Sequence, residues 1–168
     1  MRRLVALIFG AFSHAAVADD QGQVSASALL IGVNQPGPAV SPLARGEQDL
    51  KALAQTLRRQ AKYDRVTTVL GTQATASAVI AKIREAVAGI TDDGTLLVVL
   101  VTHGAGGDIG EPAFLTHGGD VMNPQRTGLS MDAFGSAMTP RTPEQNIVVV
   151  IDASHDLSLN GVALIGPA

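Results

Sequence analysis

The sequence predicts an α/β fold, with helices on both faces of a mostly parallel sheet. The apolar runs are short and uninterrupted, as in strands that are buried on both sides, and amphipathic helical repeats separate them. The composition agrees with this fold class. Hydrophobic residues make up 46% and charged residues 16% of the 168 residues, which argues against disorder and is enough for one core.

The elements are expected in a regular order. Strands are predicted over residues 28–33, 66–70, 95–102, 147–151 and 162–165, where apolar and β-branched residues run without a break. Helices are predicted over residues 50–61, over 79–90 with Thr75 as a cap, and over 129–138. Residues 104–128 carry seven glycines and are expected to form a long, mobile loop of functional importance.

The first 18 residues are typical of a secretory signal peptide. Two arginines, a short apolar run over residues 4–12 and the small residues 16–18 follow in that order, and the apolar run is too short to span a bilayer. A periplasmic or secreted domain of residues 19–168, with no membrane insertion after cleavage, is therefore expected. An N-terminal strand or a retained membrane anchor is the alternative.

The net charge of −3, without a basic cluster, predicts no nucleic-acid partner.

Two reactive side chains stand where predicted strands end. His103 directly follows the strand over residues 95–102, and Ser154 lies just beyond the strand over residues 147–151. Ligands bind outside the carboxyl ends of the strands in parallel sheets. The two side chains can therefore converge if their strands are neighbours. Without that convergence, His103 is simply a polar residue at a strand end.

Five segments, in order, resemble the catalytic subunit of caspases and, more closely, of metacaspases and their bacterial relatives. They are ALLIGVN at 28–34, LARGEQD at 43–49, ATASAVIAKIREAV at 74–87, DGTLLVVLVTHGAGG at 93–107 and DASHD at 152–156. The resemblance covers residues 26–156. It implies a caspase-like three-layer sandwich and a peptide or protein as substrate or partner. No cofactor is expected, and no metal site is assigned because the sequence has no EF-hand-type calcium loop.

The resemblance also implies roles for single residues. His103 would be the general acid or base, Ser154 stands at the position of the nucleophilic cysteine, and the N–H groups of Gly104 and Ser154 would form an oxyanion hole. Asp152 would receive a basic side chain of the substrate, and Asp120 matches an acidic residue of the loop after the histidine.

The chain departs from the family pattern in three ways. Serine replaces the nucleophilic cysteine, Asp156 replaces a serine or glycine, and the sequence ends where the family continues with strands that complete its substrate pocket. A thiol ionises far more readily than a hydroxyl, which needs a base within hydrogen-bond reach and a third group to orient that base. Only Asp108 and Asp120, both in the glycine-rich loop, are candidates to orient His103. His155 is a poor base for Ser154, because adjacent side chains in an extended segment point to opposite faces.

The sequence therefore predicts a degenerate, weak or inactive peptidase domain that keeps a peptide-binding or partner-binding cleft. Two alternatives stay open: a working hydrolase that uses Ser154 and His103, and a native cysteine peptidase in which Ser154 is an engineered replacement. A metal site of His103, His117 and Asp120 is disfavoured because their spacing matches no zinc signature. The glycine-rich stretch matches no nucleotide-binding motif.

Overall fold

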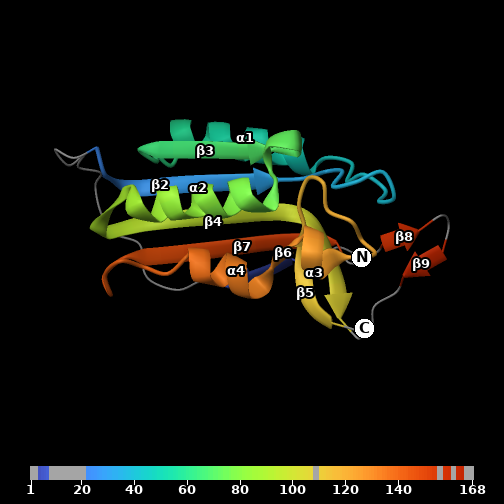
Figure 1. Ribbon diagram of the computed structural model, residues 1–168. Helices are drawn as coiled ribbons and strands as arrows, with labels where there is room; N and C mark the ends of the chain where they lie inside the picture. The colour runs from blue at the N-terminus through green and yellow to red at the C-terminus, as the bar shows by residue number, and fades with distance from the viewer. Residues whose placement is uncertain (1–3, 8–21, 108–109, 155–156, 160–161, 165–168) are drawn as a thin grey trace.

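The computed structural model describes residues 4–7, 22–107, 110–154, 157–159 and 162–164 (Figure 1). In this part of the chain one mixed sheet has the central order β1-β7-β4-β2-β3, and β5 and β6 extend it beyond β4. Its strands are β1 (Leu4–Leu7), β2 (Val24–Gly32), β3 (Arg65–Leu70), β4 (Ile90–Gly107), β5 (Gly110–Leu115), β6 (Leu129–Ser130) and β7 (Asn146–Ser154).

The central strands β3, β2, β4 and β7 are all parallel to their neighbours, as predicted. The helices are α1 (Gly46–Arg59), α2 (Ala76–Ala88), α3 (Pro124–Thr127) and α4 (Met131–Ala137), with a 3₁₀ turn at Gly71–Gln73. The cap predicted at Thr75 is present, because its hydroxyl accepts the N–H of Ala78.

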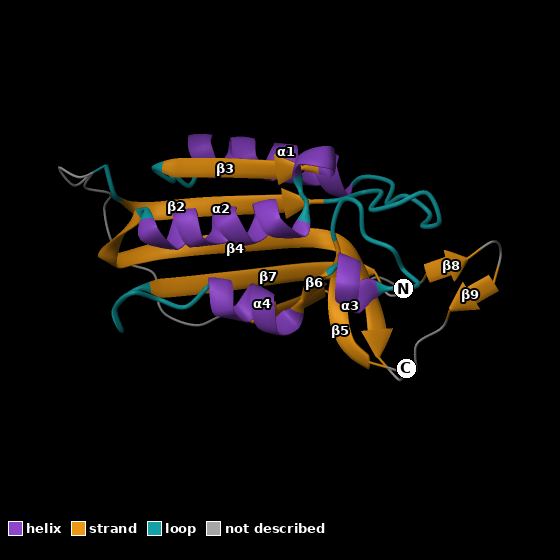
Figure 2. Ribbon diagram, in the orientation of Figure 1, coloured by secondary structure: helices purple, strands orange, loops and turns teal. Residues whose placement is uncertain are grey.

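Helices cover both faces of the sheet, so the fold has three layers (Figure 2). On one face, alternate strand residues such as Leu29 and Leu100 pack with α2 and α4. On the other face, their neighbours Leu30 and Val101 pack with α1. This alternation is the ordinary geometry of a strand, and it explains why the strands are apolar throughout.

The expectation of a long irregular loop over residues 104–128 was wrong for its first half. Strand β4 runs on past His103 to Gly107, and β5 returns beside it in antiparallel register, with His103 opposite Leu115 and Gly104 opposite Phe114. The apolar run of residues 113–115 supplies the inward side chains of this hairpin. Residues 104–107 and 110–115 of this segment are therefore sheet, whereas residues 116–128 form turns and the short helix α3. The glycines hid the strand signal.

Both ends of the chain contribute short strands. Residues Leu4–Leu7 form β1, antiparallel to β7, which is the strand alternative to a signal peptide. The remaining residues of the 1–18 segment lie outside the described residues, and export stays a prediction. The last predicted strand forms as β9 (Val162–Leu164), but it pairs only with β8 (Leu157–Leu159) in a separate hairpin.

Candidate active site

His103 and Ser154 are brought together by the sheet. Strands β4 and β7 are neighbours, and the two residues are partners in their parallel register. Adjacent strands lie about 4.8 Å apart, and register partners of a regular parallel pair project from the same face. The sheet geometry thus meets the condition under which the two side chains can converge.

That face is the one covered by α1. Val101, two residues before His103, packs in the cluster with α1, and Val101 is the register partner of Asp152. With the period of two, His103, Asp152 and Ser154 therefore share this face. Asp152 and Ser154 are partly exposed, which leaves both side chains accessible from solvent.

His103, by contrast, is almost fully buried. It is only 3% exposed, and neither ring nitrogen forms a hydrogen bond of regular geometry with any described residue. Burial lowers the pKa of His103 from its ordinary value of 6.5, and the nearby backbone carbonyl groups of Asn34 and Ser41 oppose this effect in part. The imidazole is therefore neutral at pH 7, the form that accepts a proton.

The two carbonyl groups belong to the β2–α1 loop, defined here as residues 34–43. Its neck is closed by a hydrogen bond from the N–H of Leu43 to the carbonyl of Asn34, with an N–O distance of 2.8 Å. Sequence reasoning sought a carboxylate to orient His103 and missed these backbone groups, because a carbonyl leaves no mark on the residue types. A carbonyl beside an imidazole can fix its tautomer.

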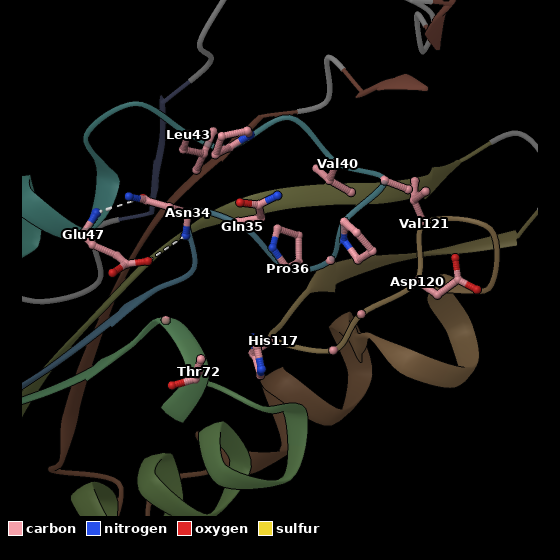
Figure 3. Close-up of a pocket in the computed structure, with 17 residues that line it drawn as sticks. Asn34, Gln35, Pro36, Val40, Leu43, Glu47, Thr72, His117, Asp120 and Val121 are labelled. Carbon is pink, nitrogen blue, oxygen red and sulfur yellow. Dashed lines mark hydrogen bonds between the residues drawn. The ribbon is translucent and has the colours of Figure 1, made fainter. Parts of the chain in front are cut away.

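A cleft of about 810 Å³ lies between this loop and the segment that follows β5. Figure 3 shows Pro36 and Val40 of the β2–α1 loop facing His117 and Thr72 across it. The described residues that line it include two carboxylates, Glu47 and Asp120, and no lysine or arginine. None of His103, Gly104, Asp152 and Ser154 lines this cleft.

At one end of the cleft, Asn34 and Glu47 are joined by two hydrogen bonds. The N–H of Asn34 donates to Glu47 Oε1 over 3.1 Å, and the N–H of Glu47 donates to Asn34 Oδ1 over 3.0 Å (Figure 3). The second bond satisfies a backbone donor in the first turn of α1. This pair fixes the start of the β2–α1 loop against α1, and sequence analysis did not single out either residue.

Asp120 lies at the other end of the cleft and forms hydrogen bonds within its own loop. Its carboxylate accepts the side-chain N–H of Asn123 over 2.7 Å and the backbone N–H of Met122 over 2.9 Å. These two bonds lower the pKa of Asp120, the Asn123 bond most strongly. His117 and Asp120 both line the cleft, but neither residue forms a hydrogen bond with His103.

Gly104 lies inside β4, directly after His103, where the strand has Phe114 of β5 as its partner. Gly104 directly follows the register partner of Ser154, so the two residues lie near one another at the carboxyl edge of the sheet, and the oxyanion hole stays a prediction. His155, Asp156 and Asp108, which entered the sequence argument, lie outside the described residues. Among the residues that are described, no group of three or more His, Asp or Glu side chains could hold a metal ion.

The fold and the paired His103 and Ser154 define an α/β domain of caspase-like architecture. The family model for the caspase domain matches the chain over residues 25–164, so the chain belongs to the caspase-domain family. No individual curated protein matches the sequence significantly. In the described part of the chain, no helix has both the length and the apolar character needed to cross a membrane.

Proposed function

We propose that this chain is an exported caspase-type peptidase domain in which Ser154 has replaced the nucleophilic cysteine. In this proposal it retains a peptide-binding site around His103, Asp152 and Ser154 and turns over substrate weakly or not at all. The partner is a peptide segment of a protein. The observation that carries the proposal is that no hydrogen bond joins His103 to Ser154, although the two described residues are register partners.

The missing contact between His103 and Ser154 matters because serine and cysteine need different degrees of activation. A thiol near a histidine is already partly ionised at neutral pH and needs little further activation. A hydroxyl reacts only when a base takes its proton in a well-aligned contact of about 2.6–3.2 Å. A neutral, unpartnered imidazole beside Ser154 supplies a base of suitable charge, but not that contact.

Substrate recognition is proposed to rest on Asp152. It is partly exposed, it lies two residues before Ser154 on β7, and it shares the face of His103. A carboxylate there would pair with a lysine or arginine side chain next to the bond at the reactive centre. The N–H groups of Gly104 and Ser154 would stabilise negative charge on the carbonyl oxygen of that bond.

A second candidate is a serine hydrolase that uses the same pair. The register of β4 and β7 favours it, because closure of a short gap between two fixed neighbours would complete a Ser–His contact. The two candidates predict the same bound peptide and differ only in turnover by the unmodified chain.

Hydrolysis of reporter peptides separates the two candidates. The full chain is compared with Ser154→Cys, with His103→Ala and with the double variant, on peptides that carry a basic or an acidic residue before the scissile bond. We expect a silent wild type, and cleavage by Ser154→Cys that is selective for basic residues and lost when His103→Ala is added. Ser136→Cys is the matched control, since it places a thiol on exposed α4, away from the site.

Each outcome assigns the function. Wild-type cleavage that disappears in His103→Ala establishes the serine hydrolase and rejects the degenerate peptidase. Silence of both the wild type and Ser154→Cys, with no binding of the basic peptides, rejects both candidates. Asp152→Asn should raise KM for basic peptides in the active Cys variant about tenfold or more, the effect of about 1.4 kcal/mol of lost binding.

A further inference from the structure

The burial of His103 calls for a physical explanation. A buried ring whose nitrogens form no hydrogen bond of regular geometry with any described residue has lost its contacts with water for little in return, which is unfavourable. Its neighbours in the sheet do not provide the cover, because Ser154 on β7 is partly exposed. The cover comes from the β2–α1 loop, whose Ser41 carbonyl lies beside the ring.

One apolar side chain anchors the middle of this loop. Val40 is 4% exposed and packs in a small separate cluster with Ala105, Leu115 and Val121. Leu115 is the partner of His103 across the β4–β5 pair, and Ala105 lies two residues further along β4. Val40 is therefore seated on the sheet next to His103, on the same face.

The remaining attachments of the loop are few. The N–H of Gly118 donates to the carbonyl of Pro36 over 2.8 Å, and Gly37 lies against the backbone of Gly119. Other loop residues, among them Pro38, Ala39 and Ser41, are exposed. Among the described contacts, the loop is held mainly by the buried residues Val40 and Pro36 and by one hydrogen bond to another loop, and a segment held in this way can open locally without unfolding the sheet.

We propose that the β2–α1 loop is a lid over His103, held shut by Val40, and that the lid must open before His103 can meet a substrate. The seat vacated by Val40 becomes an apolar subsite beside the reactive pair. Opening of the lid would therefore precede substrate binding at the proposed peptidase site, and this role rests on the proposed function. Its test needs no turnover, so the two proposals can fail separately.

The test measures access to His103 in the full chain. Diethyl pyrocarbonate acylates neutral imidazole nitrogens, and one tryptic peptide, residues 85–126, contains both His103 and His117. His117 lines the open cleft and serves as the internal reference. In the wild type, modification of His103 should be much slower than modification of His117.

Val40→Ala should raise the rate at His103 about tenfold and leave His117 unchanged, because removal of two buried methyl groups weakens the closed lid. Val87→Ala is the matched control. It makes the same change at a side chain that is also 4% exposed, on the opposite face, and should leave His103 protected. Equal rates in the two variants, or a wild-type His103 as reactive as His117, would overturn the lid.

A second variant keeps the test decisive if Val40→Ala does not fold. A Cβ atom at Gly37 would lie 2.9 Å from the carbonyl oxygen of Gly119, so Gly37→Ala must push the loop away from its neighbour. Gly135→Ala is its control, because a Cβ atom there meets nothing within 4 Å. The lid requires faster modification of His103 in Gly37→Ala than in Gly135→Ala, and equal rates reject it.

Discussion

The two faces of the sheet are closed in different ways near its carboxyl edge. On the α2 and α4 face, Phe114 and Phe134 pack edge to face with ring centroids 5.3 Å apart and an interplanar angle of 72°. On the α1 face, a loop covers His103, with Val40 as its apolar contact to the sheet. The first closure contributes to stability through large buried aromatic area, whereas the second leaves a polar group unpartnered. The α2 and α4 face therefore contributes to the stability of the fold, whereas the α1 face controls access to His103.

The largest expected effect tests the aromatic side of this comparison. Phe134 is 2% exposed, so Phe134→Ala should lower the free energy of unfolding by about 3–5 kcal/mol through lost burial and a cavity. Urea denaturation followed by circular dichroism measures the change. Met131→Ala on the same helix, at a side chain that is 41% exposed, should stay within about 0.5 kcal/mol of wild type. Similar losses in both variants would contradict a stability role for this face.

The next effect concerns the pH dependence of stability, which arises on the loop face. Because burial lowers the pKa of His103 below 6.5, the folded state binds its proton less readily than the unfolded state. Above about pH 6.5 the ring is neutral in both states and costs the folded state nothing. As the pH falls below this value, the unfolded state takes up the proton first, and the free energy of unfolding drops by up to about 1.4 kcal/mol for each unit by which the pKa is lowered. His103→Gln should flatten the stability profile between about pH 7 and pH 5. An unchanged slope in His103→Gln would show that the ring is not buried in solution.

A smaller effect is expected at the start of the loop. Asn34→Ala removes the acceptor for the N–H of Glu47 in the first turn of α1 and should cost about 1 kcal/mol. The same variant should speed hydrogen exchange of the Leu43 amide, which closes the neck on the carbonyl of Asn34. Gln35→Ala, at the exposed next residue, is the control. Slow exchange at Leu43 in Asn34→Ala would show that the neck closes without the Asn34–Glu47 pair.

The smallest effect is expected at Asp120. Its ionised carboxylate accepts two hydrogen bonds and is exposed, so solvent and salt screen its contribution. Since its pKa is lowered, this contribution is present above its ordinary value of 3.8 and is lost as the pH falls through the folded value. The melting temperature of Asp120→Ala should lie slightly below that of wild type at about pH 6, and the difference should shrink toward about pH 3.5. A constant difference would assign the effect to the loop backbone instead.

The same contrast explains what could be predicted from the sequence. The strand over residues 95–102 and the helix capped by Thr75 carry strong local signals, and both formed, although Ile90 was expected in the helix and instead begins β4. The order of strands and helices also indicated that His103 and Ser154 stand at the carboxyl edge. These features depend on periodicity and on the general rules of parallel sheets.

The cover over His103 could not be predicted in this way. It depends on contacts between distant segments, such as the bond from Gly118 to Pro36 and the packing of Val40 on Leu115. One signal was available: Val40 is an apolar residue in a stretch of proline and glycine, and such residues are often anchors. The hairpin of β4 and β5 was missed because its glycines suggested a loop, although the apolar run at residues 113–115 was typical of a strand.

The closed neck of the β2–α1 loop has a consequence for engineering. Asn34 and Leu43 meet through a backbone hydrogen bond, so the sheet and α1 fix both ends of the loop whatever lies between them. Loops whose ends are already joined tolerate changes of length and composition at small cost, because the closure entropy grows slowly with length. Residues 35–42 can therefore be exchanged as a cassette, which would let libraries of loops tune the reactivity of one histidine on an unchanged scaffold.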